Sequence, residues 1–122
     1  MNASKNDLEE GKTVSQFIHV EHPVVGLISI LVVSWRSREV YFKADTFLST
    51  LGYINPNRTL ALLCNDVVRI PSEGGAVTCI SKADVKTLIR FSSDPNIAEF
   101  STWLWEEALP HAIKTGHQLL MS

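Results

Sequence analysis

The C-terminal third of the chain constrains its fold more than any other stretch; it reads DPNIAEFSTWLWEEALPHAIKTG from Asp94 to Gly116. Asp94 can accept hydrogen bonds at a helix start, and Pro95 suits the first helical position because it has no N–H to leave unpaired. Pro110 is expected to kink or restart the helix, and Gly116 to end it in a left-handed conformation. Apolar residues recur at helical spacing at Ile97, Phe100, Leu104 and Ala108. The sequence therefore predicts a buried, kinked terminal helix.

Upstream of this helix, short runs of β-branched and aromatic residues are separated by turn residues. They predict a strand at 15–19, a hairpin at 26–42 and a second hairpin at 67–80. Further helices are expected at 43–51, 55–64 and 81–91. We therefore expect an α+β fold: one small domain at residues 15–118, with a mostly antiparallel sheet of two hairpins, short helices and the kinked C-terminal helix. Residues 1–14 are polar and are expected to form a flexible tail.

Local signals mark where three of these helices begin or end. Gly52 is well placed to end the first short helix, and Asn55 with Pro56 to start the second. The short link between these helices is compatible with a helix-turn-helix-like pair, although a plain helical corner has the same signature. Ser81 and Asp84 have the S-x-x-D spacing of a helix start.

The sequence contains no motif that indicates catalysis, and no enzymatic activity or cofactor is expected. His19 and His22 lack a third ligand nearby, so a metal site is not expected either. Cys64 and Cys79 are isolated and predict buried free thiols, which suits a reducing cytoplasm. The polar N-terminus does not resemble a signal peptide, and the apolar run at 24–33 is too short to span a bilayer. We expect a cytoplasmic protein without a membrane segment.

Three segments in this order resemble the Bro-N domain, the N-terminal domain of baculovirus repeated-ORF proteins and of many phage antirepressors. The front segment reads VYFKAD from Val40 to Asp45, followed by Leu51-Gly52-Tyr53 and Asn55-Pro56. The middle segment reads AVTCISKADVKTLIRFS. The rear segment comprises Trp103, Glu107, Leu109, Pro110, Ile113, Lys114, Thr115 and Gly116. The resemblance spans about residues 16 to 116 and implies a viral or phage regulator that binds DNA, often through a domain joined to a second one.

The net charge of −2 means that any nucleic-acid site must be a local patch, because phosphate binding relies on cations. With the resemblance, the residues that we expect at such a patch are Arg36, Arg38, Lys43, Asn55, Asn57 and Arg58. The alternative is that these cations only solvate loops. The chain also departs from the family pattern, because its second short helix, TLALLCNDV, and its loop RFSSDPNI lack the usual basic residues. Acting as a homodimer would double a modest patch and match a palindromic site.

Trp103 and Trp105 suggest a different function. They are two residues apart on the predicted terminal helix and therefore point to different sides, so at least one is expected to be partly exposed. Tryptophan is enriched among the residues that anchor protein interfaces. In this alternative the chain does not bind DNA but binds a repressor or a host protein, as an antirepressor or inhibitor. Packing of both rings inside the domain is the competing interpretation.

Overall fold

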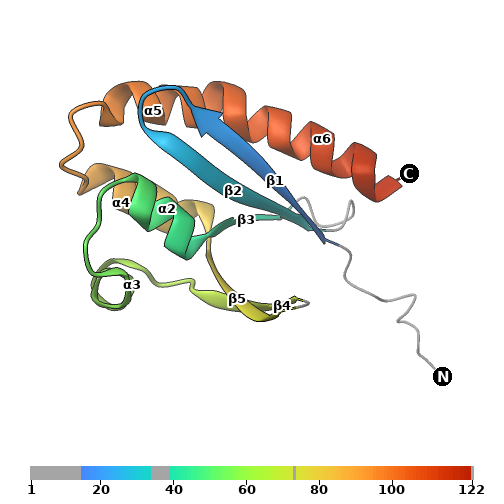
Figure 1. Ribbon diagram of the computed structural model, residues 1–122, viewed down its shortest axis with the longest axis horizontal. Coiled ribbons are helices and arrows are strands. Elements are labelled where there is room, and N and C mark those ends of the chain that lie inside the picture. The colour runs from blue at the N-terminus through green and yellow to red at the C-terminus, as the bar shows by residue number, and fades with distance from the viewer. Residues whose placement is uncertain (1–14, 34–38, 73, 122) are drawn as a thin grey trace.

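An antiparallel sheet of five strands organises the chain in the computed structural model, which describes residues 15–33, 39–72 and 74–121 (Figure 1). The strand order is β1-β2-β3-β5-β4, and every neighbouring pair is antiparallel. The elements are β1 Ser15–His22, β2 Gly26–Val33, β3 Val40–Lys43, α2 Ala44–Thr50, α3 Pro56–Leu63, β4 Val68–Ser72, β5 Gly75–Ile80, α4 Lys82–Arg90, α5 Ile97–Trp103, the π-helical turn η1 Leu104–Ala108 and α6 Leu109–Met121.

The predicted α+β fold with two hairpins is confirmed, and the two hairpins are parts of one sheet. β2 pairs with β3, and β4 with β5, as expected. β1 extends to His22 and pairs with β2 along its whole length. The hairpins join where Phe42 pairs with Ile80 and Lys43 with Cys79. The predicted tail at 1–14, and the turn at 34–38 that carries Arg36 and Arg38, lie outside the described residues.

The main core fills the space between one face of the sheet and the helices. Alternate residues of β2 point into it, as the pleat of a strand requires: Ile28, Ile30 and Val32 are all fully buried. Phe47 of α2 lies between two other rings, with centroid distances of 5.8 Å to Phe42 and 6.1 Å to Phe100. These aromatic contacts tie α2 and α5 to the sheet.

A second, smaller apolar cluster lies on the opposite face and consists of strand residues alone. Leu31, Val33 and Cys79 are buried there. Residues that pack around them are Phe17, Tyr41, Val68, Ile70 and Val77. The sheet therefore buries apolar side chains on both faces, which explains the almost continuous apolar run of β2.

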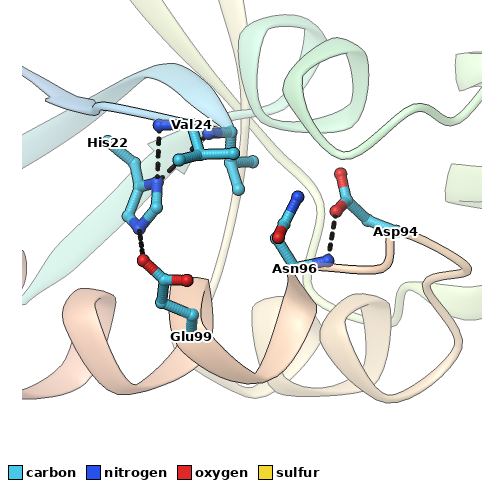
Figure 2. Close-up of polar contacts among 6 residues, drawn as sticks. His22, Val24, Asp94, Asn96 and Glu99 are labelled. Carbon is cyan, nitrogen blue, oxygen red and sulfur yellow. Dashed lines mark hydrogen bonds and ion pairs between the residues drawn. The ribbon is translucent and has the colours of Figure 1, made fainter.

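The C-terminal helix begins later than predicted and contains a wide turn. Its first residue is Ile97, and Asp94 does not cap the helix but accepts a hydrogen bond from the backbone N–H of Asn96 at 2.8 Å (Figure 2). Leu109 N–H donates to the carbonyl of Leu104, a five-residue spacing that forms η1. Pro110 follows at the second residue of α6, and the chain continues as a helix to Met121. The predicted interruption near Pro110 thus takes the form of a π-helical turn.

The prediction that Gly116 ends this helix is wrong. Gly116 lies inside α6 and is buried against β2. A Cβ atom at this position would lie 2.6 Å from the Cβ of Val32. A glycine is required here because helix and strand approach closely, and not because of any special backbone angle.

Both cysteines are free, as predicted, but only Cys79 is fully buried, since Cys64 is half-buried. Burial raises the pKa of each thiol to about 11, with further contributions from Asp84 at Cys64 and from Asp45 at Cys79. In the unfolded chain a thiol ionises near its ordinary pKa. The native state therefore holds these protons more tightly than the unfolded chain does. The resulting contribution to the free energy of unfolding is present below the ordinary pKa of a thiol and is lost as the pH rises toward 11.

We therefore expect alkaline pH to destabilise the wild type more than a Cys79→Ala variant. Between pH 8 and pH 10.5 the free energy of unfolding of the wild type should fall by roughly 2 kcal/mol more than that of the variant. Urea unfolding of both proteins at the two pH values measures this difference. Equal losses in the two proteins would show that the Cys79 thiol does not hold its proton more tightly in the folded state.

Candidate nucleic-acid interface

The candidate interface centres on α3, a helix at the surface whose start is set by local sequence signals. Gly52, with a φ of 82°, ends the preceding turn, and the side chain of Asn55 accepts a hydrogen bond from Arg58 N–H at 3.1 Å. Pro56 occupies the first helical position, as predicted. No residue of α3 is fully buried, and only its inner side, at Leu60 and Leu63, packs against the core. α3 thus presents most of its circumference to solvent.

The end of α3 is held by a buried carboxylate. Asp84 of α4 is 2 % exposed, and its two oxygens accept hydrogen bonds from the backbone N–H groups of Asn65 and Asp66 at 2.9 and 2.8 Å. Ser81 caps α4 by accepting a hydrogen bond from Asp84 N–H, as the S-x-x-D spacing predicted. The segment that leaves α3 is therefore fixed to the start of α4.

The six residues predicted to contact DNA divide into three groups. Lys43 and Asn57 line the same cavity, although 14 positions separate them in the chain. Asn55 and Arg58 lie at the exposed start of α3, where the Asn55 side chain also serves as the helix cap. Arg36 and Arg38 lie outside the described residues.

The cavity that Lys43 and Asn57 share has a volume of about 370 Å³ and opens between the starts of α2 and α3 and the strand β5. Its wall is apolar at Leu48, Leu60 and Val77. Its lining carries both signs of charge, at Lys43 and Asp45, together with the neutral polar residues Asn57 and Thr78. The cavity is lined by Lys43, Ala44, Asp45, Leu48, Pro56, Asn57, Leu60, Ala76, Val77 and Thr78.

Three polar residues near this cavity were not predicted from the sequence. Asp45 and Thr78 line it, and Arg69 of β4 is exposed and pairs directly with Thr78 across the β4–β5 hairpin. Directly opposite residues of an antiparallel pair share a face of the sheet. Arg69 therefore adds a cation on the face where Thr78 lies, and only the register of the hairpin could have indicated it.

A comparison with protein families supplies the identification. A family model described as the BRO family, N-terminal domain, matches residues 30–110, more than half of the chain. The chain belongs to the BRO family. The resemblance seen in the sequence is thereby confirmed, and a BRO domain indicates a regulatory protein of the phage or viral kind. No curated protein and no solved structure matches the chain.

The motifs that carry the resemblance serve mainly as the scaffold of the BRO domain. Gly52 ends α2, and the hydroxyl of Tyr53 donates to the carbonyl of Leu88 at 2.6 Å, which joins the α2–α3 link to α4. Gly116 fits against Val32. The residues of the family signature therefore account for the fold of the domain.

The two tryptophans proposed as a protein interface are half-buried in the BRO domain, and both pack against the main core. The ring of Trp103 lies 5.1 Å from that of His22 and 5.5 Å from that of Phe100. The ammonium of Lys86 lies 5.7 Å from the centroid of the Trp105 ring, a cation–π contact. Each ring thus has partners within the domain, and its role in binding another protein stays a prediction.

His22 occupies a structural position: it contacts Val24 and Glu99 (Figure 2) and lies beside Trp103. It is 3 % exposed, and its Nδ1 accepts hydrogen bonds from the backbone N–H groups of Val24 and Val25, both at 3.1 Å. Two donors at Nδ1 require the ring proton to lie on Nε2, which is 3.5 Å from Glu99 Oε2. His22 therefore holds the β1–β2 turn and connects it to α5.

Metal and membrane functions find no support in the described ranges. His19 is exposed and lies 2.7 Å from the Ser29 hydroxyl, on the opposite face of β1 from His22. Within the described ranges, no cluster of three His, Cys, Asp or Glu side chains could hold a metal ion. No helix of this part of the chain combines the length and the apolar character needed to cross a bilayer.

Proposed function

We propose that this BRO-family domain is a non-enzymatic regulator of transcription that binds DNA through α3 and its surroundings. The observation that carries the proposal is the exposure of α3, whose side away from the core bears Arg58 and whose first turn also exposes Asn57. Arginine donates paired hydrogen bonds to phosphate or guanine, and asparagine donates to and accepts from base edges.

Neighbouring cations extend the proposed contact beyond α3. Lys43 lies beside Asn57 in the cavity wall, and Arg69 is on the face of the sheet that carries Thr78. Arg36 and Arg38 join this set as sequence predictions. We propose that the protein acts as a homodimer in the cytoplasm of the host cell, because two copies of a small patch supply the phosphate contacts that one acidic chain lacks.

The proposal is tested by fluorescence anisotropy with a pool of labelled short duplexes, titrated over salt concentration. We expect binding that weakens steeply with salt. Arg58→Ala and Lys43→Ala should each weaken binding roughly three- to tenfold and lower the salt slope by about one. Lys114→Ala is the matched control, because Lys114 is exposed on α6, which packs on β1 and β2. Absence of binding at low salt, or an equal loss in the control, would contradict the proposal.

The alternative is that the domain binds a repressor or host protein and not DNA. Large apolar side chains around α3 favour it, since Ile54 is 96 % and Leu62 is 69 % exposed. Apolar anchors of this kind are more typical of protein interfaces than of phosphate contacts. This alternative predicts an association that tolerates salt and no change in anisotropy with any duplex.

A further inference from the structure

β3 and β5 pair over only a short length, which leaves part of β5, within the described chain, without a strand partner on the side facing β3. This part of β5 is not among the residues proposed to contact DNA. β5 pairs with β4 from Gly75 to Ile80, but β3 reaches only the last two residues of β5 before the chain turns into α2 at Ala44. Within the described ranges, no strand pairs with Ala76, Val77 or Thr78 on the β3 side. These residues therefore form a strand edge inside the outline of the sheet.

This strand edge opens onto the cavity of about 370 Å³ described above, because Ala76, Val77 and Thr78 form one of its walls. Ligand cavities begin at about 300 Å³, so this one is large enough for a small group. Opposite the edge lie the start of α2 and Leu60 of α3. A chain that runs along β5 would thus have beside it a recess with both polar and apolar lining residues.

The chemistry of the edge and its rim selects an extended polypeptide. A strand edge presents alternating backbone N–H and C=O groups, and another extended backbone is the ligand that pairs with them. Leu60 offers apolar surface beside the edge, and a small apolar side chain of the added strand suits that position. The rim carries one cation, Lys43, and one carboxylate, Asp45, and such a balance fits a neutral backbone better than a chain of phosphates.

We propose that an extended peptide segment of a partner protein adds to β5 as a strand at Ala76–Thr78 and places one small apolar side chain against Leu60. The bound segment would occupy the place that β3 leaves when it turns into α2. It would cover Lys43 and Asn57, which line the same cavity. The proposal stands whether or not the domain binds DNA.

The test uses a random heptapeptide library displayed on phage and selected against the whole chain. Selected peptides are synthesised and titrated into the ¹⁵N-labelled protein. We expect the amide resonances of Ala76, Val77 and Thr78 to shift and hydrogen exchange in this segment to slow by tenfold or more. Failure to select any peptide, or shifts confined to other parts of the domain, would overturn the proposal.

A pair of tryptophan variants locates the site. Asn57→Trp should fill the mouth of the cavity and weaken peptide binding at least tenfold. Leu62→Trp introduces the same ring on the same helix at a residue that does not line the cavity, and should leave binding unchanged. Circular dichroism melts establish that both variants fold. Equal binding by the two variants, or a shift of the β5 amides by an oligo-dT strand but by no peptide, would exclude the peptide site.

Discussion

Replacing Gly116 with alanine is expected to destabilise the domain by about 2 kcal/mol, although alanine forms helices better than glycine by about 1 kcal/mol. The new Cβ would lie 2.6 Å from Val32 Cβ and 2.7 Å from Val32 Cγ2. Val32 is fully buried and belongs to β2, which is held between β1 and β3. Neither side can yield without moving the sheet or α6. Urea unfolding monitored by circular dichroism measures the loss.

Two further variants separate this contact from helix propensity. Lys114→Ala, on the exposed side of the same helix, should change the stability by less than about 0.5 kcal/mol. Val32→Ala removes both Cγ atoms, so adding Gly116→Ala to it should cost about 1 kcal/mol less than in the wild type. A Gly116→Ala protein as stable as the wild type would show that α6 does not require a glycine here.

Replacing His22 with alanine is expected to cost about 3 kcal/mol. The change removes a buried ring that lies 5.1 Å from the Trp103 ring and 5.9 Å from the Phe100 ring, which leaves a cavity. It also leaves the partly buried N–H groups of Val24 and Val25 without their acceptor, which adds to the cost. Urea unfolding followed by tryptophan fluorescence reports both the stability and the surroundings of Trp103.

Two substitutions at His22 separate the stability lost with the ring from the stability lost with the hydrogen-bond acceptor. His22→Asn keeps an acceptor for the turn, because asparagine side chains commonly accept hydrogen bonds from N–H groups two or three residues onward. His22→Phe keeps the ring but not the acceptor. Both should lie between wild type and alanine, while His19→Ala, on the exposed face of the same strand, should have little effect. If alanine at His22 proves equally harmless, the turn does not depend on this side chain.

The parts of the fold that the sequence predicted correctly are those with a local cause. Asn55 and Pro56 begin α3, and Ser81 begins α4, because each acts on N–H groups within three residues. The union of the hairpins could not be predicted, since it rests on the distant pairs Phe42–Ile80 and Lys43–Cys79, which leave no local signal. Pairing of β1 with β2 was missed for a different reason, because the first strand was expected to end at His19 and the turn at 23–25 that joins it to β2 was not recognised.

Gly116 shows how a local sequence rule fails where packing between distant segments determines the residue type. Glycine near the end of a predicted helix usually marks its C-terminus, but here α6 continues to Met121 and the residue serves a contact with a strand 84 positions earlier, at Val32. Asp94 was assigned as a helix cap by similar reasoning, and it organises the turn before the helix.

The candidate site was predicted in part. Lys43 and Asn57 were assigned to one DNA-binding patch, and both line one cavity. Asp45 and Thr78 were not singled out, because their place there depends on how β5 approaches the two helix starts. Arg69 acquires its position only through the register of β4.

The π-helical turn η1 makes the C-terminal helix sensitive to its number of residues. The buried positions follow one another at intervals of four: Phe100, Leu104, Ala108, Ala112 and Gly116. An α-helix has 3.6 residues per turn, so such a series would drift around it by about 40° at each step, and the wider turn at η1 takes up part of that drift. A single inserted or deleted residue within η1 would rotate Gly116 away from Val32 by about 100°. This segment is therefore constrained in its length as strictly as in its composition.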